Sequence, residues 1–225
     1  MKKINLGLLL AVTSLSAYKN DLLPKNIKQQ KPELTTTYNV ITQNELTARE
    51  REFAINFLTQ TESGVFNSVK NLSEAQLNFK PAADKWSAED CVKHIAVSEK
   101  NLWNMVETSL KQAANPEKRE GIKFTDEQLI SAVENRSHKS KTFAALEPVN
   151  SPYKTTAEAL ADFKENREKL IAFVKSTQDD LRNHVSVLPM GTYDAYQFIL
   201  LISAHSNRHT QQIEEVKAST GFPKN

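Results

Sequence analysis

Apolar side chains recur at intervals of three and four residues in four long segments of this 225-residue chain. That spacing places them on one face of an α-helix and predicts four amphipathic helices. The first is expected over roughly 48–72, because Thr47 and Glu50 match a capping box at its start. A loop through Phe79-Lys80-Pro81 follows, since proline interrupts regular structure. The predicted inner face of this helix holds Phe53, Ala54, Phe57, Leu58, Val65, Phe66 and Val69.

The other three helices also begin at capping residues. Ser87 is suited to cap the second helix, and Thr155 with Glu158 forms a capping box for the third. A turn at 189–191 precedes Thr192, which is expected to cap the last helix. The predicted inner faces of these three helices hold, in order, Cys91, His94, Ile95, Ser98, Leu102, Met105 and Val106; Leu160, Phe163, Leu170, Ile171, Val174 and Leu181; and Phe198, Ile199, Ile202, His205, His209, Ile213 and Val216.

The interval between the second and third helices is expected to be mostly irregular. It runs from about 113 to 152 and carries three prolines, but Thr125 begins a short helix near 126–137. No strand signal matches the helical ones in strength. The predicted fold is therefore all-α, a four-helix bundle with a short extra helix between helices two and three.

Composition and charge narrow the function classes. The 5 glycines and 8 prolines are few, which favours helices, and the length fits one substantial domain, expected over 43–225. A formal charge of +2 gives no reason to expect a nucleic-acid partner. Cys91 is the single cysteine, which excludes an intramolecular disulfide framework and a zinc site built mainly from cysteines.

The N-terminal segment has the pattern of a signal peptide. Lys2 and Lys3 precede an apolar run from Ile4 to Val12, and Ala17 offers a small residue for cleavage. We expect 1–17 to direct export to the periplasm or the exterior, with a cytoplasmic extension as the alternative. The run is too short for a permanent membrane anchor. Residues 18–42 are polar and are predicted to form a linker.

Three histidines fall on predicted inner faces. His205 and His209 stand four residues apart, so one helix presents both imidazoles on the same side, as it does when two ligands bind one metal ion. His94 lies on the inner face of another helix, and bundle cores are where facing helices build metal sites. Three imidazoles on a divalent ion leave a position open for water or substrate. The alternative is a set of hydrogen-bonded core histidines that bind no metal.

The two remaining histidines have other expected roles, and some metal chemistries are disfavoured. His138 lies in a polar stretch and is predicted to be exposed, whereas His184 is assigned a loop or capping role, with the mouth of the site as the alternative. Ser206 occupies the position of the general-base glutamate in an HExxH peptidase, so that chemistry is disfavoured. The paired Glu-x-x-His motifs of four-helix di-iron proteins are not found.

Two stretches resemble the signatures of the DinB-like superfamily. Its second-helix signature is matched by Lys85-Trp86-Ser87-Ala88-Glu89-Asp90-Cys91-Val92-Lys93-His94-Ile95, with Trp-Ser at the cap and a histidine two turns later. Its last-helix signature is matched by His205-x-x-Arg208-His209-x-x-Gln212-Ile213. The resemblance also includes the order and spacing of the four helices and covers about residues 45–220.

The resemblance implies an up-down-down-up four-helix bundle in which His94, His205 and His209 hold one divalent ion. Zinc is the expected ion, and nickel, iron or manganese also suit an all-imidazole site. Characterised relatives include metal-dependent transferases that use low-molecular-weight thiols such as bacillithiol and mycothiol. A cation beside sulfur stabilises the thiolate, which agrees with that chemistry. Export would separate this chain from the cytosolic thiols.

Three hypotheses of function follow. The first is a metal-dependent enzyme, either a thiol S-transferase or a hydrolase, acting on a small electrophile. The second is a non-catalytic metal-binding or stress-associated helical protein, with a homodimer as a further expectation. The third is a helical domain whose histidines pack without a metal.

Gln212 and Arg208 are expected to support the site from outside the ligand set. Gln212 lies three residues after His209, near enough in angle to flank the cleft or to bond a neighbouring helix. Arg208 is rotated by about 100° from His209, so a salt bridge to a neighbouring helix is its predicted role.

Overall fold

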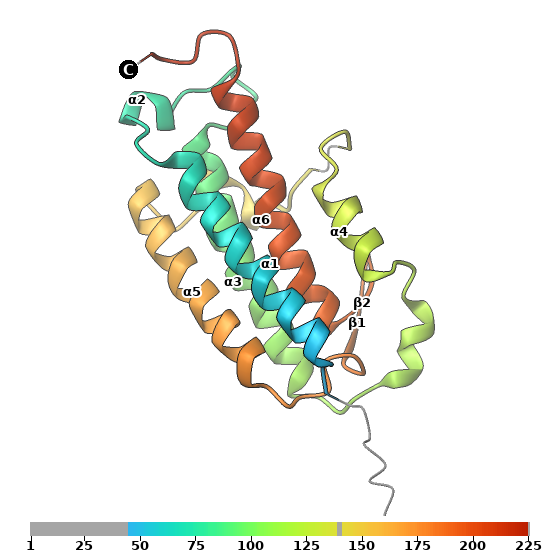
Figure 1. Cartoon of the computed structure of the whole chain (residues 1–225). Coiled ribbons are helices and arrows are strands. Elements are labelled where there is room, and N and C mark those ends of the chain that lie inside the picture. The colour runs from blue at the N-terminus through green and yellow to red at the C-terminus, as the bar shows by residue number, and fades with distance from the viewer. Residues whose placement is uncertain (1–44, 139–140, 225) are drawn as a thin grey trace, which may run out of the picture. The chain divides into compact units, whose positions relative to one another are not determined.

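Four long helices form the body of the protein. In the computed structural model, which describes residues 45–138 and 141–224, these helices are α1 (Ala48–Val69), α3 (Ala88–Leu110), α5 (Thr156–Ser176) and α6 (Ala195–Lys217) (Figure 1). The predicted four-helix bundle is confirmed. The expected signal peptide, 1–17, and linker, 18–42, lie outside the described residues.

Contacts between helix ends give the direction of each helix. The Tyr196 hydroxyl donates to the Glu50 carbonyl oxygen at 2.8 Å, so α6 and α1 begin at the same end of the bundle. The Thr156 hydroxyl donates to a carboxylate oxygen of Glu89 at 2.8 Å, so α5 and α3 begin together at the other end. Each parallel pair packs against the other pair, since α3 contacts α6 and α1 contacts α5. The order is therefore up-down-down-up.

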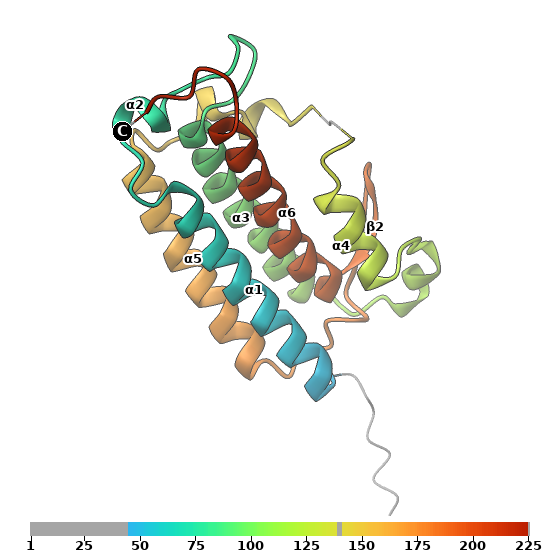
Figure 2. The same cartoon turned by 45° about the horizontal axis from the view of Figure 1, so that its top comes forward.

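The direction of the helices requires a long crossover, because α3 and α5 run the same way. The crossover holds the 3-10 helix η1 (Pro116–Gly121), α4 (Asp126–Glu134), and two further 3-10 helices, η2 (Ala144–Leu146) and η3 (Pro148–Asn150). α4 confirms the predicted short helix, is capped by Thr125, and lies against α6 (Figure 2). The turn between α1 and α3 adds the one-turn helix α2 (Glu74–Leu77), which the periodicity did not predict.

A β-hairpin precedes α6 and corrects the sequence prediction there. Strands β1 (Val185–Leu188) and β2 (Gly191–Asp194) pair antiparallel, with Val185 opposite Asp194. Thr192 is therefore a strand residue, and Asp194 caps α6 by accepting a hydrogen bond from the Gln197 N–H at 2.7 Å. Gly191 has φ +146, a conformation that L side chains rarely adopt, which explains the glycine in this turn.

Two predicted inner-face residues lie elsewhere. Leu181 is fully buried but belongs to the turn after α5, which ends at Ser176. Phe53 is 46% exposed, because it borders an open groove between α1 and α4 rather than the core.

α6 is buried on all sides over residues 195–204, where α1, α3 and α4 pack against it. No helix in the described ranges is long and apolar enough to span a membrane.

Candidate metal centre

The structure brings His94, His205 and His209 together. Because α3 and α6 are antiparallel, the first half of α3 lies beside the second half of α6. The Nε2 atom of His205 lies 3.3 Å from Nε2 of His94 and 3.2 Å from Nε2 of His209. One ring nitrogen from each residue lies within 4.8 Å of the others. This cluster of His94, His205 and His209 is called the triad below.

The spacing of the triad nitrogens fits one small cation. Imidazole nitrogens lie about 2.0–2.1 Å from a zinc ion, so neighbouring nitrogens of a tetrahedral site are about 3.3–3.4 Å apart. The separations of 3.2 and 3.3 Å between Nε2 atoms agree with that value. All the donors are imidazole, a set that suits zinc, nickel, copper or iron. The triad can therefore hold a divalent ion without a change in fold.

Hydrogen bonds on the far side of two rings set the orientation of their nitrogens. His94 Nδ1 lies 2.7 Å from the carbonyl oxygen of Leu146, which can only accept, so Nδ1 carries the proton. His209 Nδ1 lies 3.1 Å from Oε1 of Gln212, which also accepts. In both neutral rings the lone pair is then on Nε2 and faces the centre of the triad.

Burial keeps the imidazoles neutral. It lowers the pKa of His94, and it holds the pKa of His209 well below the ordinary value, with help from the neighbouring His205. Burial, followed by the proximity of His94 and Arg208, lowers the pKa of His205 to about 3. Neutral imidazole is the form that binds a metal ion, so protons would compete weakly for this site.

Trp86 and Ser98 line the triad. The Trp86 ring stacks on His209 with centroids 5.8 Å apart and lies 4.9 Å from the His94 ring. Its position follows from the next residue, Ser87, whose hydroxyl caps α3 by accepting from Asp90 N–H. The buried Ser98 hydroxyl lies 3.4 Å from His94 Nε2. His205 alone of the triad is partly exposed.

Arg208 contacts a neighbouring helix, which is α4, through hydrogen bonds and not through the expected salt bridge. Its guanidinium donates to the backbone carbonyl oxygens of Val133, Asn135 and His138, at the end of α4 and just beyond. The expected salt bridge is thus replaced by hydrogen bonds to carbonyls that the end of a helix leaves unpaired. Gln212 flanks the triad, as its angle on the helix predicts.

The other predictions about individual side chains can also be compared with the structure. His138 is exposed, as predicted. His184 lies in the turn before β1, 2.8 Å from the Asp180 carbonyl oxygen and 3.2 Å from that of Gln112, at the end of the bundle away from the triad. It therefore has the loop role and not the alternative at the mouth of the site. Cys91 is fully buried, and burial raises the pKa of its thiol.

Sequence reasoning missed a buried ion pair behind the triad. Arg167 on α5 and Glu99 on α3 are 0% and 2% exposed and form a two-pronged salt bridge, with both N···O distances 2.6 Å. The same guanidinium donates to the Ser206 hydroxyl at 2.9 Å, and Ser206 lies between His205 and His209 on α6. It also donates to the Leu58 carbonyl oxygen and the Thr61 hydroxyl of α1. One arginine thus joins all four helices.

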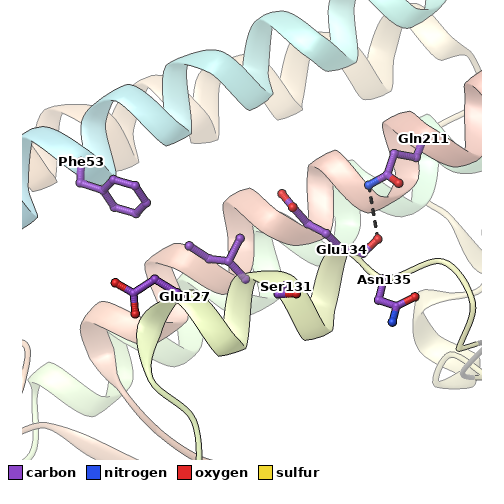
Figure 3. A pocket seen from close by; sticks show the side chains of 7 residues that line it. Phe53, Glu127, Ser131, Glu134, Asn135 and Gln211 are labelled. Atoms are coloured by element: carbon purple, nitrogen blue, oxygen red, sulfur yellow. Dashed lines mark hydrogen bonds between the residues drawn. The ribbon is translucent and has the colours of Figure 1, made fainter.

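An open groove of about 530 Å³ lies away from the triad, between α1, α4 and α6 (Figure 3). Phe53 projects into it from α1, and Gln211 of α6 donates to the Glu134 carbonyl oxygen of α4 at 3.3 Å. The groove has no cluster of metal ligands or nucleophiles. Its lining residues are Phe53, Glu127, Ile130, Ser131, Glu134, Asn135 and Gln211.

The chain is similar to known proteins in sequence and in fold. YuaE of Bacillus subtilis (strain 168), itself uncharacterized, is 26% identical over 155 residues, which are 68% of this chain and 90% of YuaE. YfiT from Bacillus subtilis, described as a probable metal-dependent hydrolase with an unusual four-helix bundle topology, has a TM-score of 0.54 and 16% identity. The superposition covers 79% of this chain and 91% of YfiT, and it shows a shared fold.

A family model provides the assignment. The model of the DinB superfamily matches residues 58–213, a range that includes the whole triad. That range is more than half of the chain. The chain therefore belongs to the DinB superfamily.

Proposed function

We propose that the protein is a divalent-metal-dependent enzyme, in which His94, His205 and His209 hold the ion and a small electrophilic molecule is the substrate. The observation that carries the proposal is the convergence of three Nε2 atoms at 3.2 and 3.3 Å. The Nε2 atoms of His94 and His209 bear lone pairs that face the centre of the triad, an arrangement that a cation would stabilise.

Each residue around the triad has a distinct task in this proposal. Leu146 and Gln212 hold the rings of His94 and His209 so that Nε2 faces the ion. The Trp86 ring excludes water from one side of the triad, while the partly exposed side of His205 admits the substrate. A bound divalent ion would supply the positive charge that lowers the pKa of water or a thiol and polarises the substrate.

The buried Ser98 hydroxyl has a task of its own. Its nearest partner in the triad, His94 Nε2, would be taken by the ion, which frees the hydroxyl to orient a nucleophile or a substrate oxygen. Serine is both donor and acceptor, so it can serve either group. The expected consequence is that Ser98→Ala lowers turnover more than it lowers metal affinity.

Hydrolysis is the first candidate reaction, and transfer to a thiol is the second. The fold neighbour YfiT is described as a probable metal-dependent hydrolase, and three imidazoles leave the open position that water activation needs. Thiol transfer is supported by the resemblance of the two helix signatures to a superfamily whose characterised members include enzymes that use low-molecular-weight thiols. Export, if 1–17 is a signal peptide, would favour water over a cytosolic thiol.

Metal content and turnover test the proposal separately. The protein, freed of any histidine tag, is expected to copurify with or bind about one zinc, nickel, iron or manganese ion per chain, and His205→Ala is expected to lose it. His138→Ala is the matched control, because this histidine is exposed and outside the triad. A wild-type protein that binds no divalent ion contradicts the proposal.

Turnover then distinguishes an enzyme from a metal-binding protein. The metal-loaded protein is assayed for hydrolysis of a panel of activated esters and amides, and for consumption of small thiols with electrophiles. Activity that depends on the ion and is lost in His205→Ala supports catalysis. Full metal occupancy without turnover in either assay would favour the non-catalytic metal-binding protein instead.

A further inference from the structure

We propose that Arg136 is a positioning residue of the triad: it fixes the orientation of the Gln212 amide, and through it the nitrogen of His209 that carries the proton. The inference rests on the proposed metal site, because it concerns how one of its ligands is prepared. Arg136 lies just beyond α4, in the crossover, and matches no part of the two helix signatures.

The contacts form a short chain that ends at the triad. Arg136 Nη1 donates to Oε1 of Gln212 at 3.1 Å, and the same Oε1 lies 3.1 Å from His209 Nδ1. Two further nitrogens of Arg136 donate to the two carboxylate oxygens of Glu215, at 3.0 and 2.7 Å. This fork holds the guanidinium in a fixed place, so its contact with Gln212 is not that of a freely moving side chain.

Arg136 fixes the orientation of the Gln212 side-chain amide. A glutamine amide can present either its oxygen or its NH₂ group, because the two ends have nearly the same shape. A guanidinium has donors only, so it pairs with the oxygen and repels the NH₂ group. With Oε1 facing Arg136, the same oxygen also faces His209 Nδ1, and an oxygen acceptor there requires the proton on Nδ1. Nε2 is then left free to bind an ion.

The two buried histidines of the triad therefore differ in how firmly their tautomer is set. The acceptor for His94 is the carbonyl oxygen of Leu146, which belongs to the backbone and cannot be exchanged for a donor. The acceptor for His209 is one end of an amide that can turn over. Arg136 supplies for His209 the constraint that the backbone supplies for His94.

The tautomer of His209 in the metal-free protein is the direct readout. Long-range ¹⁵N–¹H correlation spectra at pH 8, where the imidazoles are neutral, identify the protonated nitrogen of each ring. The wild-type protein is expected to carry the His209 proton on Nδ1. In Arg136→Ala the spectra should show a mixture with the Nε2–H form, while His94 stays unchanged. A His209 ring that keeps its Nδ1 proton in Arg136→Ala overturns the inference.

Replacement of the amide by a carboxylate provides the second test. In Gln212→Glu both oxygens are acceptors, so the side chain no longer needs Arg136 to orient it. Zinc affinity, measured by competition with a chromophoric chelator, should fall about 10-fold for Arg136→Ala in the Gln212 protein, the scale of effect typical of outer-shell partners. In the Gln212→Glu protein the same change should cost less than about 2-fold. Equal losses in both backgrounds overturn the inference.

Two other consequences of Arg136→Ala, the loss of a positive charge and a looser end of α4, must be distinguished from the loss of amide orientation. The direction of the change in zinc affinity excludes the first, and a control variant excludes the second. Removal of a positive charge near a cation site would by itself strengthen zinc binding, whereas the inference requires weaker binding. Arg208→Ala loosens the same end of α4, because Arg208 holds the carbonyl oxygens of Val133, Asn135 and His138, but it does not contact the Gln212 amide in the bonds described above. It should leave the His209 tautomer unchanged; a shifted tautomer in Arg208→Ala would mean that loosening alone explains the result and would overturn the role of Arg136.

The two readouts also distinguish this inference from the proposed function. If the wild-type protein binds no divalent ion, the proposed function fails, yet the spectra of the metal-free protein still decide whether Arg136 sets the tautomer. If the protein binds zinc but the tautomer and the affinity cycle do not respond to Arg136, the inference fails and the metal site remains.

Discussion

Two clusters of buried polar side chains in the core of the bundle differ in how their donors and acceptors are arranged. Arg167 and Glu99 carry opposite charges, form two bonds of 2.6 Å, and use their remaining donors on Ser206, Thr61 and a backbone oxygen of α1. Donors and acceptors are matched, so the cluster needs nothing from outside. This is the arrangement of a structural element.

In the triad, by contrast, imidazole lone pairs point toward a common centre and no opposite charges are paired. In its three neutral imidazoles, the protons of His94 and His209 are used on the outside, and the lone pairs of their Nε2 atoms face inward. The inner side therefore presents two acceptors that a divalent cation would satisfy together, whereas the nearby donors are the single N–H of neutral His205 and the Ser98 hydroxyl. Ser206, which bonds to Arg167, lies next to His205 on α6, so the two clusters adjoin each other and differ in their chemistry. A buried polar cluster indicates a cation site when its lone pairs converge on one point.

The largest expected effect is the loss of the ion pair. Arg167→Ala leaves the buried Glu99 carboxylate without its counter-ion, and breaking a buried pair in this way costs about 3–5 kcal/mol of unfolding free energy. Urea denaturation of the two proteins measures the cost. The paired change Glu99→Leu with Arg167→Met removes both charges at similar volume and should cost much less. A loss below about 1 kcal/mol in Arg167→Ala would mean that the pair does not hold the helices together.

The next largest expected effect is the stabilisation of the folded protein by a bound divalent ion, which depends on the triad and not on the ion pair. A divalent ion at about 100 times its dissociation constant should stabilise the wild-type protein by about 2.7 kcal/mol, because it binds the folded state. His205→Ala should abolish that gain while lowering the metal-free stability by less than the lost zinc stabilisation, because His205 is the least buried residue of the triad. Thermal unfolding with and without zinc measures both quantities, with His138→Ala as control. An undiminished zinc effect in His205→Ala would place the ion elsewhere.

The same contrast explains which parts of the site could be predicted from the sequence. His94, His205 and His209 follow the helical period of their own segments, so a bundle with two facing helices brings them together. Arg167 and Glu99 are 68 residues apart, and Arg136 and Gln212 are 76 apart. Their pairing depends on how α5 and the crossover pack against α3 and α6, which no local pattern encodes. Glu99 could have been noticed only as a charge on an otherwise apolar face.

Local signals likewise decided which parts of the fold were predicted. The capping residues Thr47, Ser87 and Thr155 each begin a helix as predicted, because a cap is a short-range interaction. The hairpin was missed because its strands have four residues each, too few for an alternating pattern to stand out. Phe53 was placed in the core because periodicity does not show that α4 leaves a groove beside α1.

Acid should destabilise the metal-free protein through the triad. The folded-state pKa of each triad histidine is lowered, to about 3 for His205, whereas the unfolded-state value is about 6.5. At a pH between the folded-state and unfolded-state pKa values, the unfolded protein binds more protons than the folded protein. The free energy of unfolding therefore falls as pH decreases from about 6.5. Each neutral histidine contributes a slope of up to about 1.4 kcal/mol per pH unit.

Urea denaturation of the metal-free protein between pH 7.5 and 5 measures that slope. His205→Gln removes one titrating group, so its slope should be smaller than that of the wild type by about the contribution of one histidine. The same change at the exposed His138 should leave the slope unaltered. A wild-type stability that does not change over this range would show that the triad histidines titrate in the folded state as they do in the unfolded state.

The smallest expected effect concerns Arg208, which lies beside His209 in sequence but serves the structure and not the ion. Its bonds to the Val133, Asn135 and His138 carbonyl oxygens fasten the end of α4 to α6. Arg208→Ala should therefore lower the unfolding free energy by about 1–2 kcal/mol, the range for hydrogen bonds from a charged donor that remains partly solvated. Zinc affinity should change by less than about 2-fold, since outer-shell partners that orient a ligand cost 10-fold or more. A stable Arg208→Ala protein that no longer binds zinc would place Arg208 in the site, and the distinction between a structural cluster of paired groups and a ligand cluster of converging lone pairs would then fail on α6.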